Sequence, residues 1–342
     1  MEGRGERIPA TIPDGQGRLS GRHVSSCTTH LSINLLPMTA PRPANVDDLR
    51  GIIDLLDAIF RRAKGVEDQS VLTDFPLLFA EENLGNCRVI ERDGRIVSHA
   101  AVWPRTLDFA GQAIGVGIIV LVATELESRR RGLAAELMQD LQTAMPGIGC
   151  QLGLLWTGVP EFYQPLGWQI VNTPGWSASG SGTGDEVDRR LQVVDFDPAR
   201  HLAAIHQLHQ SHSPHSRRTP AESAQLFTLP KCPVLVGESE GRAVTYLVDG
   251  QATNKRGLIE YAGAARDVWE LVQHVVADQG PRQLLVFPTH MELADWAREA
   301  GWSIEPLRSS KGFGDEMVLV LDETLSNSPI LEQLFCWGLD QA

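Results

Sequence analysis

The chain has 342 residues, 42% of them hydrophobic, which is enough to bury a sizeable core and more than one domain usually needs. Its 43 acidic side chains outnumber 30 basic ones, and the formal net charge is -13. This balance argues against nucleic-acid binding and favours cationic or neutral partners.

Cysteine usage indicates a reducing compartment. The 5 cysteines are scattered and include no C-x-x-C pair, which argues against a disulfide framework and against a zinc site. We therefore expect a cytoplasmic protein. No apolar run approaches the roughly 18 residues that a membrane-spanning helix needs, so no membrane partner is expected.

The first part of the chain has no hydrophobic periodicity. Residues 1–37 are rich in Gly, Arg, Ser, Thr and Pro, a composition that cannot offset the entropy of ordering. We expect a disordered leader over residues 1–40. An alternative is that translation begins at Met38, and the sequence leaves both open.

Alternating helix and strand patterns follow from Asn45 onward. Apolar residues recur at helical spacing as far as Phe60, which predicts an amphipathic helix. Two β-rich runs surround Asp93-Gly94, a dipeptide that is typical of tight hairpins. The further elements expected are strands at 103–109 and 114–124, a helix at 133–141 and a strand at 152–157.

The second half of the chain repeats parts of the first. Residues 174–190 are dense in Gly and Ser and predict a linker. After it, 238–248 resembles 91–102, and 300–304 resembles 166–170, which suggests a duplicated unit. We therefore expect an α/β (α+β) protein of two tandem mixed-sheet domains. Their predicted bounds are 41–173 and 191–322, with a C-terminal tail at 323–342.

A turn with three arginines stands out against the acidic background. Residues 122–138, VATELESRRRGLAAELM, predict a strand end, a polar turn and the start of a helix. Free N–H groups and the helix dipole make such a start a natural site for phosphate, and Gly132 lets a ligand approach closely. The alternative is a solvated turn. The second unit has no such turn, since 259–272 read IEYAGAARDVWELV.

These residues resemble the GNAT superfamily of acyl-CoA N-acetyltransferases. The run from Arg129 to Ala134 matches its Q/R-x-x-G-x-G/A pyrophosphate loop, and Val122-Ala123-Thr124 stands where the family pairs a strand with pantetheine. The resemblance implies acetyl-CoA as cosubstrate and no metal. The cofactor-binding residues it implies are Val122, Ala123, Thr124, Arg129, Arg130, Arg131, Gly132, Leu133, Ala134 and Ala135.

A tyrosine follows at the position where the family has one. The segment 161–168, EFYQPLGW, looks like the family element that carries a tyrosine near the thioester sulfur. The resemblance therefore implies that Tyr163 protonates or orients the departing thiol. The alternative is an aromatic packing residue. In arrangement the chain is similar to tandem enzymes of the enhanced-intracellular-survival type, which implies a competent first GNAT-like domain followed by a degenerate second one. Two departures are that Leu126 replaces a usual proline and that no sterol-carrier-like domain is apparent.

A general base is not readable from the sequence. Glu125, Glu161, His99 and Asp108 each qualify by position, and by resemblance the terminal carboxylate of Ala342 does as well. The base therefore stays unassigned.

Two other patterns suggest competing sites. Histidines recur every third residue at His206, His209, His212 and His215, which suggests a metal site. No acidic or cysteine ligand lies among them, so we favour a solvated helix end. Residues 115–117, GVG, lack the third glycine of a dinucleotide fingerprint and predict a glycine-containing strand.

The function expected from these observations is acetyl-CoA-dependent N-acetylation of a small amine or a protein amino group. The acceptor cleft is expected between the two halves, where the acidic field attracts cations. The alternative is a non-catalytic acyl-CoA-binding sensor or scaffold. A homo-oligomer is left open.

Overall fold

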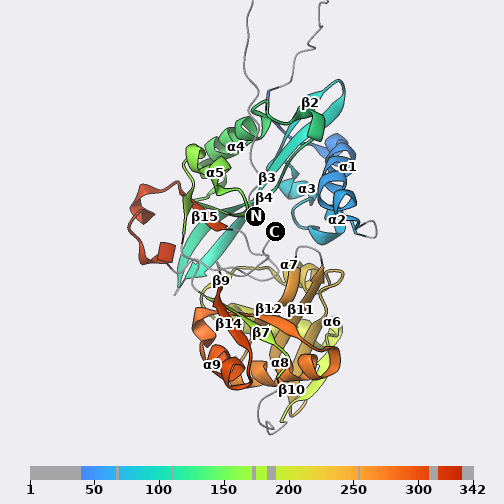
Figure 1. The fold of residues 1–342 in the computed structure, drawn as a ribbon, viewed down its shortest axis with the longest axis vertical. Helices are drawn as coiled ribbons and strands as arrows, with labels where there is room; N and C mark the ends of the chain where they lie inside the picture. The colour runs from blue at the N-terminus through green and yellow to red at the C-terminus, as the bar shows by residue number, and fades with distance from the viewer. Residues whose placement is uncertain are drawn as a thin grey trace, which may run out of the picture. The chain divides into compact units, whose positions relative to one another are not determined.

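The computed structural model describes residues 40–66, 69–109, 111–171, 175–182, 190–252, 255–307 and 315–332. Within these residues the chain forms two mixed β-sheets flanked by helices (Figure 1), which confirms the predicted fold class. The predicted leader before residue 40 and the part of the predicted tail beyond residue 332 lie outside the described residues.

The first sheet has the order β1-β2-β3-β4-β5-β15-β6, and β9 pairs with β3 beside this path. Its neighbours are antiparallel except for β4 and β5, which run parallel. The strands are β1 (Arg42–Pro43), β2 (Cys87–Arg92), β3 (Arg95–Phe109), β4 (Gln112–Thr124), β5 (Leu152–Thr157), β15 (Asp315–Val320), β6 (Gln169–Ile170) and β9 (His215–Ser216).

Helices cover both faces of the first sheet. The predicted amphipathic helix forms as α1 (Leu49–Phe60), and it buries Ile52 and Leu56 against one face. On the other face α4 (Leu133–Ala144) buries Leu137 and Leu141. We refer to these as the α1 face and the α4 face. The shorter helices of this half are α2 (Val71–Asp74), α3 (Glu81–Leu84) and α5 (Pro160–Tyr163).

The second sheet has the order β14-β7-β13-β12-β11-β10-β8. Its strands are β14 (Ser303–Pro306), β7 (Trp176–Gly180), β13 (Arg282–Val286), β12 (Lys255–Ala262), β11 (Arg242–Ala252), β10 (Val234–Ser239) and β8 (Gln192–Asp195). The helices of this half are α6 (Pro198–Ser211), α7 (Pro220–Leu226), α8 (Ala265–Gln279) and α9 (Glu292–Glu299).

The two halves exchange strands, which the sequence did not predict. β7 lies inside the segment 174–190 that was expected to be a linker, yet it pairs with β13 and β14 of the second sheet. β15 lies inside the predicted second domain, yet it pairs with β5 and β6 of the first sheet. Gly180 at the end of β7 has no side chain, and a Cβ there would stand only 2.5 Å from the ring of Trp302, so glycine allows Trp302 to pack against this strand.

Two local expectations can be compared directly with the backbone. The hairpin at Asp93-Gly94 is confirmed, because both residues are left-handed, with φ of 52° and 73°. The strand expected at 103–109 is instead the second part of one continuous strand, β3, which begins at Arg95. This long strand carries one end of the candidate site.

Candidate active site

The parallel strands β4 and β5 separate part-way along their length. They pair only from Val116 to Ile118 on β4 and from Leu152 to Leu154 on β5, although β4 continues to Thr124 and β5 to Thr157. The far edge of β5 stays paired with β15. Residues 119–124 therefore present main-chain groups that β5 does not pair.

A β-bulge lies in this unpaired part of β4. The β3 register passes from His99 opposite Ala123 to Ala101 opposite Val120, so β4 has one residue more than β3 here. Leu121 in the bulge is left-handed, with φ of 53°. The Nδ1 atom of His99 lies 2.9 Å from the carbonyl oxygen of Leu121, and this contact holds the bulge in place.

The arginine turn leads directly from β4 into α4. Gly132 is the N-cap residue with φ of 84°, and no side chain caps the first N–H groups of the helix within the described residues. Arg129, Arg130 and Arg131 are exposed. Arg129 is held to the strand end, since its Nε donates to the carbonyl oxygen of Thr124 at 3.0 Å. An uncapped helix start beside exposed guanidinium groups is suited to bind an anion.

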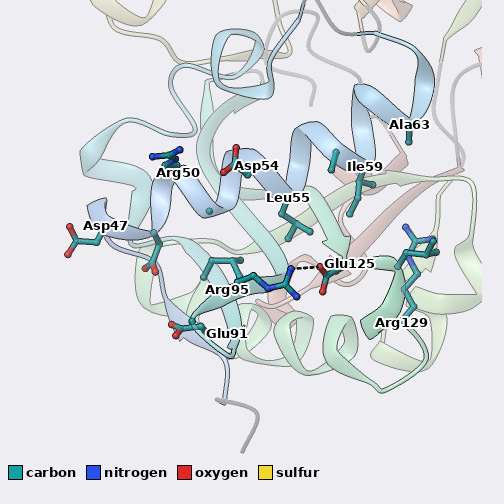
Figure 2. Close-up of a pocket in the computed structure, with 16 residues that line it drawn as sticks. Asp47, Arg50, Asp54, Leu55, Ile59, Ala63, Glu91, Arg95, Glu125 and Arg129 are labelled. Carbon is teal, nitrogen blue, oxygen red and sulfur yellow. Dashed lines mark ion pairs between the residues drawn. The ribbon is translucent and has the colours of Figure 1, made fainter. Parts of the chain in front are cut away.

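A cavity of about 850 Å³ adjoins this turn (Figure 2). It lies between one side of α1 and the ends of β3 and β4, and Arg129 stands at its rim. An ion pair of 3.4 Å between Arg95 and Glu125 spans its floor. Neither Tyr163 nor any of residues 122–124 lines it, so the cavity lies beside the candidate strand rather than within the opening between β4 and β5.

Tyr163 lies at the end of α5, on the α4 face of the sheet, and only 8% of it is exposed. Its ring contacts Phe162 and Trp168 edge-on, at centroid distances of 4.7 and 6.4 Å. Burial raises the pKa of its hydroxyl to about 12, while a hydrogen bond with Thr157 opposes this rise. The phenol is therefore protonated near neutral pH, as a proton donor must be.

The base candidates lie in different surroundings. Glu125 is paired with Arg95, and Glu161 is exposed. Asp108 lies at the far end of β3, where the Arg217 guanidinium 2.7 Å away lowers its pKa. His99 is fully buried, and burial lowers its pKa to about 4. Ala342 lies outside the described residues.

The prediction of a solvated helix end is wrong for two of the four histidines, His209 in α6 and His215 in β9. His209 and His215 are buried, at 2% and 7% exposure, because α6 packs against β11 and the chain folds back through β9. His209 lies 3.6 Å from buried Glu260, which receives two hydrogen bonds from Arg218. The described residues hold no group of His, Cys, Asp and Glu suited to a metal ion.

The other rival pattern is a strand, as predicted. Gly115 and Gly117 lie in β4, and a Cβ on Gly115 would stand 1.8 Å from the carbonyl oxygen of Gly149. These glycines permit close packing rather than dinucleotide binding. In the part of the chain that is described, no helix is both long and apolar enough to span a bilayer.

Comparison with known families accounts for the geometry of the first half. Residues 40–171 match the family model of the acetyltransferase (GNAT) domain. This part of the chain is a GNAT acetyltransferase domain. GNAT acetyltransferases use acetyl-CoA and act on amines. The GNAT domain thus contains the opening between β4 and β5, the arginine turn and Tyr163.

Curated relatives of the GNAT domain are amino-acid acetyltransferases. The protein of Azotobacter vinelandii is 24% identical over 129 residues, and that of Pseudomonas aeruginosa PAO1 is 25% identical over 129 residues. Each match covers 37% of this chain but only 27% of the relative. The chain therefore matches about a quarter of the length of these relatives.

Solved structures share the fold over both halves. A probable N-acyltransferase of Enterococcus faecalis aligns with a TM-score of 0.66 and 16% identity, covering 84% of this chain and 74% of the other. Eis1 of Mycobacterium abscessus aligns with a TM-score of 0.57 and 14% identity, covering 83% and 74%. These likenesses establish the fold, including the region beyond the GNAT domain.

Two residues near the opening were missed by sequence reasoning. Thr157 forms the hydrogen bond with Tyr163, and Glu316 on β15 is a buried carboxylate opposite Trp156 of β5. A threonine at a strand end carries no recognisable signal. Glu316 directly precedes the apolar run MVLV of β15, and an acid beside such a run is the cue that the sequence offered.

Proposed function

We propose that this protein is an N-acetyltransferase that moves an acetyl group from acetyl-CoA to a primary amine. The observation that supports this most is the opening between the parallel strands β4 and β5, with an uncapped, arginine-flanked helix start following β4 and Tyr163 following β5. The GNAT domain match gives this arrangement its chemistry.

In this proposal the arginine turn holds the diphosphate of acetyl-CoA. The N–H groups of residues 132–135 and the side chains of Arg129, Arg130 and Arg131 supply positive charge. Main-chain groups of Val122, Ala123 and Thr124, which β5 leaves unpaired, receive the pantetheine arm. The thioester then reaches the part of the opening near the bulge.

The proposed reaction balances without a metal. The amine nitrogen forms a bond to the acetyl carbon, and the carbon–sulfur bond breaks. Tyr163 gives its proton to the departing thiolate, and the proton that the nitrogen loses restores the phenol. Free main-chain N–H groups beside the bulge stabilise the oxyanion that forms on the carbonyl.

The acceptor, the domain bounds 41–173 and 191–322, a homo-oligomer and a cytoplasmic location stay predictions. An amino acid is one acceptor to test, because the curated relatives are named amino-acid acetyltransferases. Other primary amines fit equally with a negatively charged chain.

The test is thiol release from acetyl-CoA in the presence of a panel of amino acids, arylalkylamines, polyamines and peptides, with products identified by mass spectrometry. Acetylated product from any amine, lost in Tyr163→Phe, supports the proposal. Tight binding of acetyl-CoA without release in any case would contradict it and favour an acyl-CoA sensor instead.

A further inference from the structure

His99 keeps one ring nitrogen without a partner inside the protein. Its ring is fully buried, and Nδ1 lies 2.9 Å from the carbonyl oxygen of Leu121. A carbonyl oxygen only accepts hydrogen bonds, so Nδ1 carries the ring proton. The Nε2 atom then carries a lone pair and can only accept a hydrogen bond, and none reaches it from the described residues. Folded proteins rarely leave a buried acceptor unfilled without a functional reason.

The lone pair faces the α1 side of the first sheet. His99 lies opposite Val89 and Ala123, which both belong to the core on that side. Its ring also lies 6.4 Å from the ring of Phe79. Tyr163 is on the α4 side. The unfilled acceptor and the proposed proton donor are therefore on opposite faces of the opening.

A second unfilled polar atom occurs across the opening. The indole Nε1 of Trp156 on β5 is buried and has no hydrogen-bond partner within the described residues. The Trp156 side chain packs with the α1-side core. Its cross-strand neighbour is Glu316, of which only 2% is exposed. By the alternation of side chains, Glu316 points to the same face as Val318, which also belongs to the α1-side core.

We propose that the acceptor amine binds on the α1 face of the opening, where Nε2 of His99 accepts a hydrogen bond from the amine nitrogen. This inference rests on the proposed acetyl transfer. The nitrogen then approaches the carbonyl from one face while Tyr163 protonates the sulfur from the other. Trp156 offers the matching donor to a polar group of the same substrate.

The surroundings select a class of amine. A substrate must leave water almost completely to reach a fully buried histidine beside Phe79. An amine on an apolar body loses less hydration than a polyamine with several charges. We therefore infer an aliphatic or arylalkyl primary amine, for which 2-phenylethylamine is the probe.

Two substitutions separate the two nitrogens of His99. In His99→Asn the amide nitrogen replaces Nδ1 as donor to Leu121, while nothing replaces the Nε2 lone pair. In His99→Gln the longer amide places an oxygen acceptor near Nε2. His206→Asn, in α6, is the matched control, because that ring bonds Ser223 of α7 in the second half of the chain. Acetyl-CoA affinity reports whether each variant is folded.

We expect His99→Asn to lower kcat/KM for 2-phenylethylamine by about tenfold, and His99→Gln to recover part of this loss. The affinity of both variants for acetyl-CoA should stay within about twofold of the wild-type value. In the wild type, the ¹⁵N resonance of Nε2 shifts when 2-phenylethylamine is added without acetyl-CoA. An unchanged kcat/KM in His99→Asn, or an unmoved resonance with 2-phenylethylamine, spermidine and L-lysine alike, overturns the inference. Because the resonance needs no turnover, a missing thiol release would count against acetyl transfer alone.

Discussion

Met317 of β15 lies directly opposite Leu155 of β5, so a strand from near the end of the described chain completes the sheet of the GNAT domain. On its other side Met317 pairs with Ile170 of β6. Met317 is fully buried in the α4-side core that includes Tyr163, whereas Ile170 is 48% exposed. The candidate site thus depends on residues outside the matched GNAT segment.

Substitution of Met317 is therefore expected to weaken the site from a distance. Met317→Ala removes a fully buried side chain and should lower the free energy of unfolding by about 2–5 kcal/mol. Its partner provides the control, because Ile170→Ala at an exposed edge should change stability by about 0.5 kcal/mol or less. Chemical denaturation of both variants measures this, and equal effects would show that β15 does not support the sheet.

The exchange of β7 and β15 explains where sequence reasoning failed. Patterns such as the helix of α1 and the hairpin at Asp93-Gly94 are local, and the structure confirms them. The partner of a strand is not local. Residues 176–180 read WSASG, whose small residues resemble a linker, yet Trp302 packs against Gly180 in this segment. No property of the segment itself predicts which sheet receives it.

The candidate site divides in the same way. The turn at 129–134 and its helix start were predictable, because capping and charge are written in consecutive residues. The bulge at Leu121 and its contact with His99 were not, because they depend on the register between two strands. His99 could be named as a base candidate by position, but its tautomer and unfilled nitrogen required the fold.

A charge placed at Gly132 should weaken CoA binding without harming the helix. Asn and Asp have the same shape and tolerate a left-handed φ better than other side chains do, so Gly132→Asn controls for the added atoms. An acid at a helix start stabilises the helix but repels phosphate. We expect Gly132→Asp to bind CoA at least about tenfold more weakly than Gly132→Asn.

Calorimetry at two salt concentrations tests this prediction. Because salt screens exposed charges, the difference between the Asp and Asn variants should shrink at high salt. If both bind CoA with the affinity of the wild type, the diphosphate is not held at residues 129–135.

Loss of the Tyr163 hydroxyl should slow turnover but leave acetyl-CoA binding intact. General acid catalysis typically contributes about 10²–10⁴-fold, so kcat of Tyr163→Phe should fall by that order. Thr157→Val removes the hydrogen-bond partner and should have a smaller effect. Phe162→Leu disturbs the same ring contacts and should lower stability rather than kcat. A similar kcat for Tyr163→Phe and the wild type would reduce Tyr163 to a packing residue.

The pKa of Tyr163 adds a signature to the pH profile. A proton donor works below its pKa, and burial raises that value to about 12. The rate should therefore show no decline attributable to Tyr163 as pH rises toward about 11. A basic limb near pH 10 that disappears in Tyr163→Phe would show that the phenol is less buried than its 8% exposure indicates.

Acid should destabilise the protein through its buried neutral histidines. Burial lowers the pKa of His99 from 6.5 to about 4. Between these two pH values the ring is protonated in the unfolded chain but stays neutral in the folded protein. The contribution of neutral His99 to the free energy of unfolding is therefore fully present above pH 6.5 and is lost as pH falls toward 4. At pH 5 the loss attributable to His99 is about 2 kcal/mol.

Denaturant unfolding at pH 7 and pH 5 measures this loss. His99→Asn, which has no titrating ring, should reduce the difference between the two pH values by about 2 kcal/mol. Exposed His274→Asn should leave the difference unchanged. His212, whose pKa burial lowers to about 3, should behave like His99, so His212→Asn is expected to remove a further part of the acid sensitivity. If His99→Asn keeps the acid sensitivity of the wild type, the His99 ring is protonated or reached by water in the folded protein. In that case its Nε2 atom is not the buried acceptor that the amine requires.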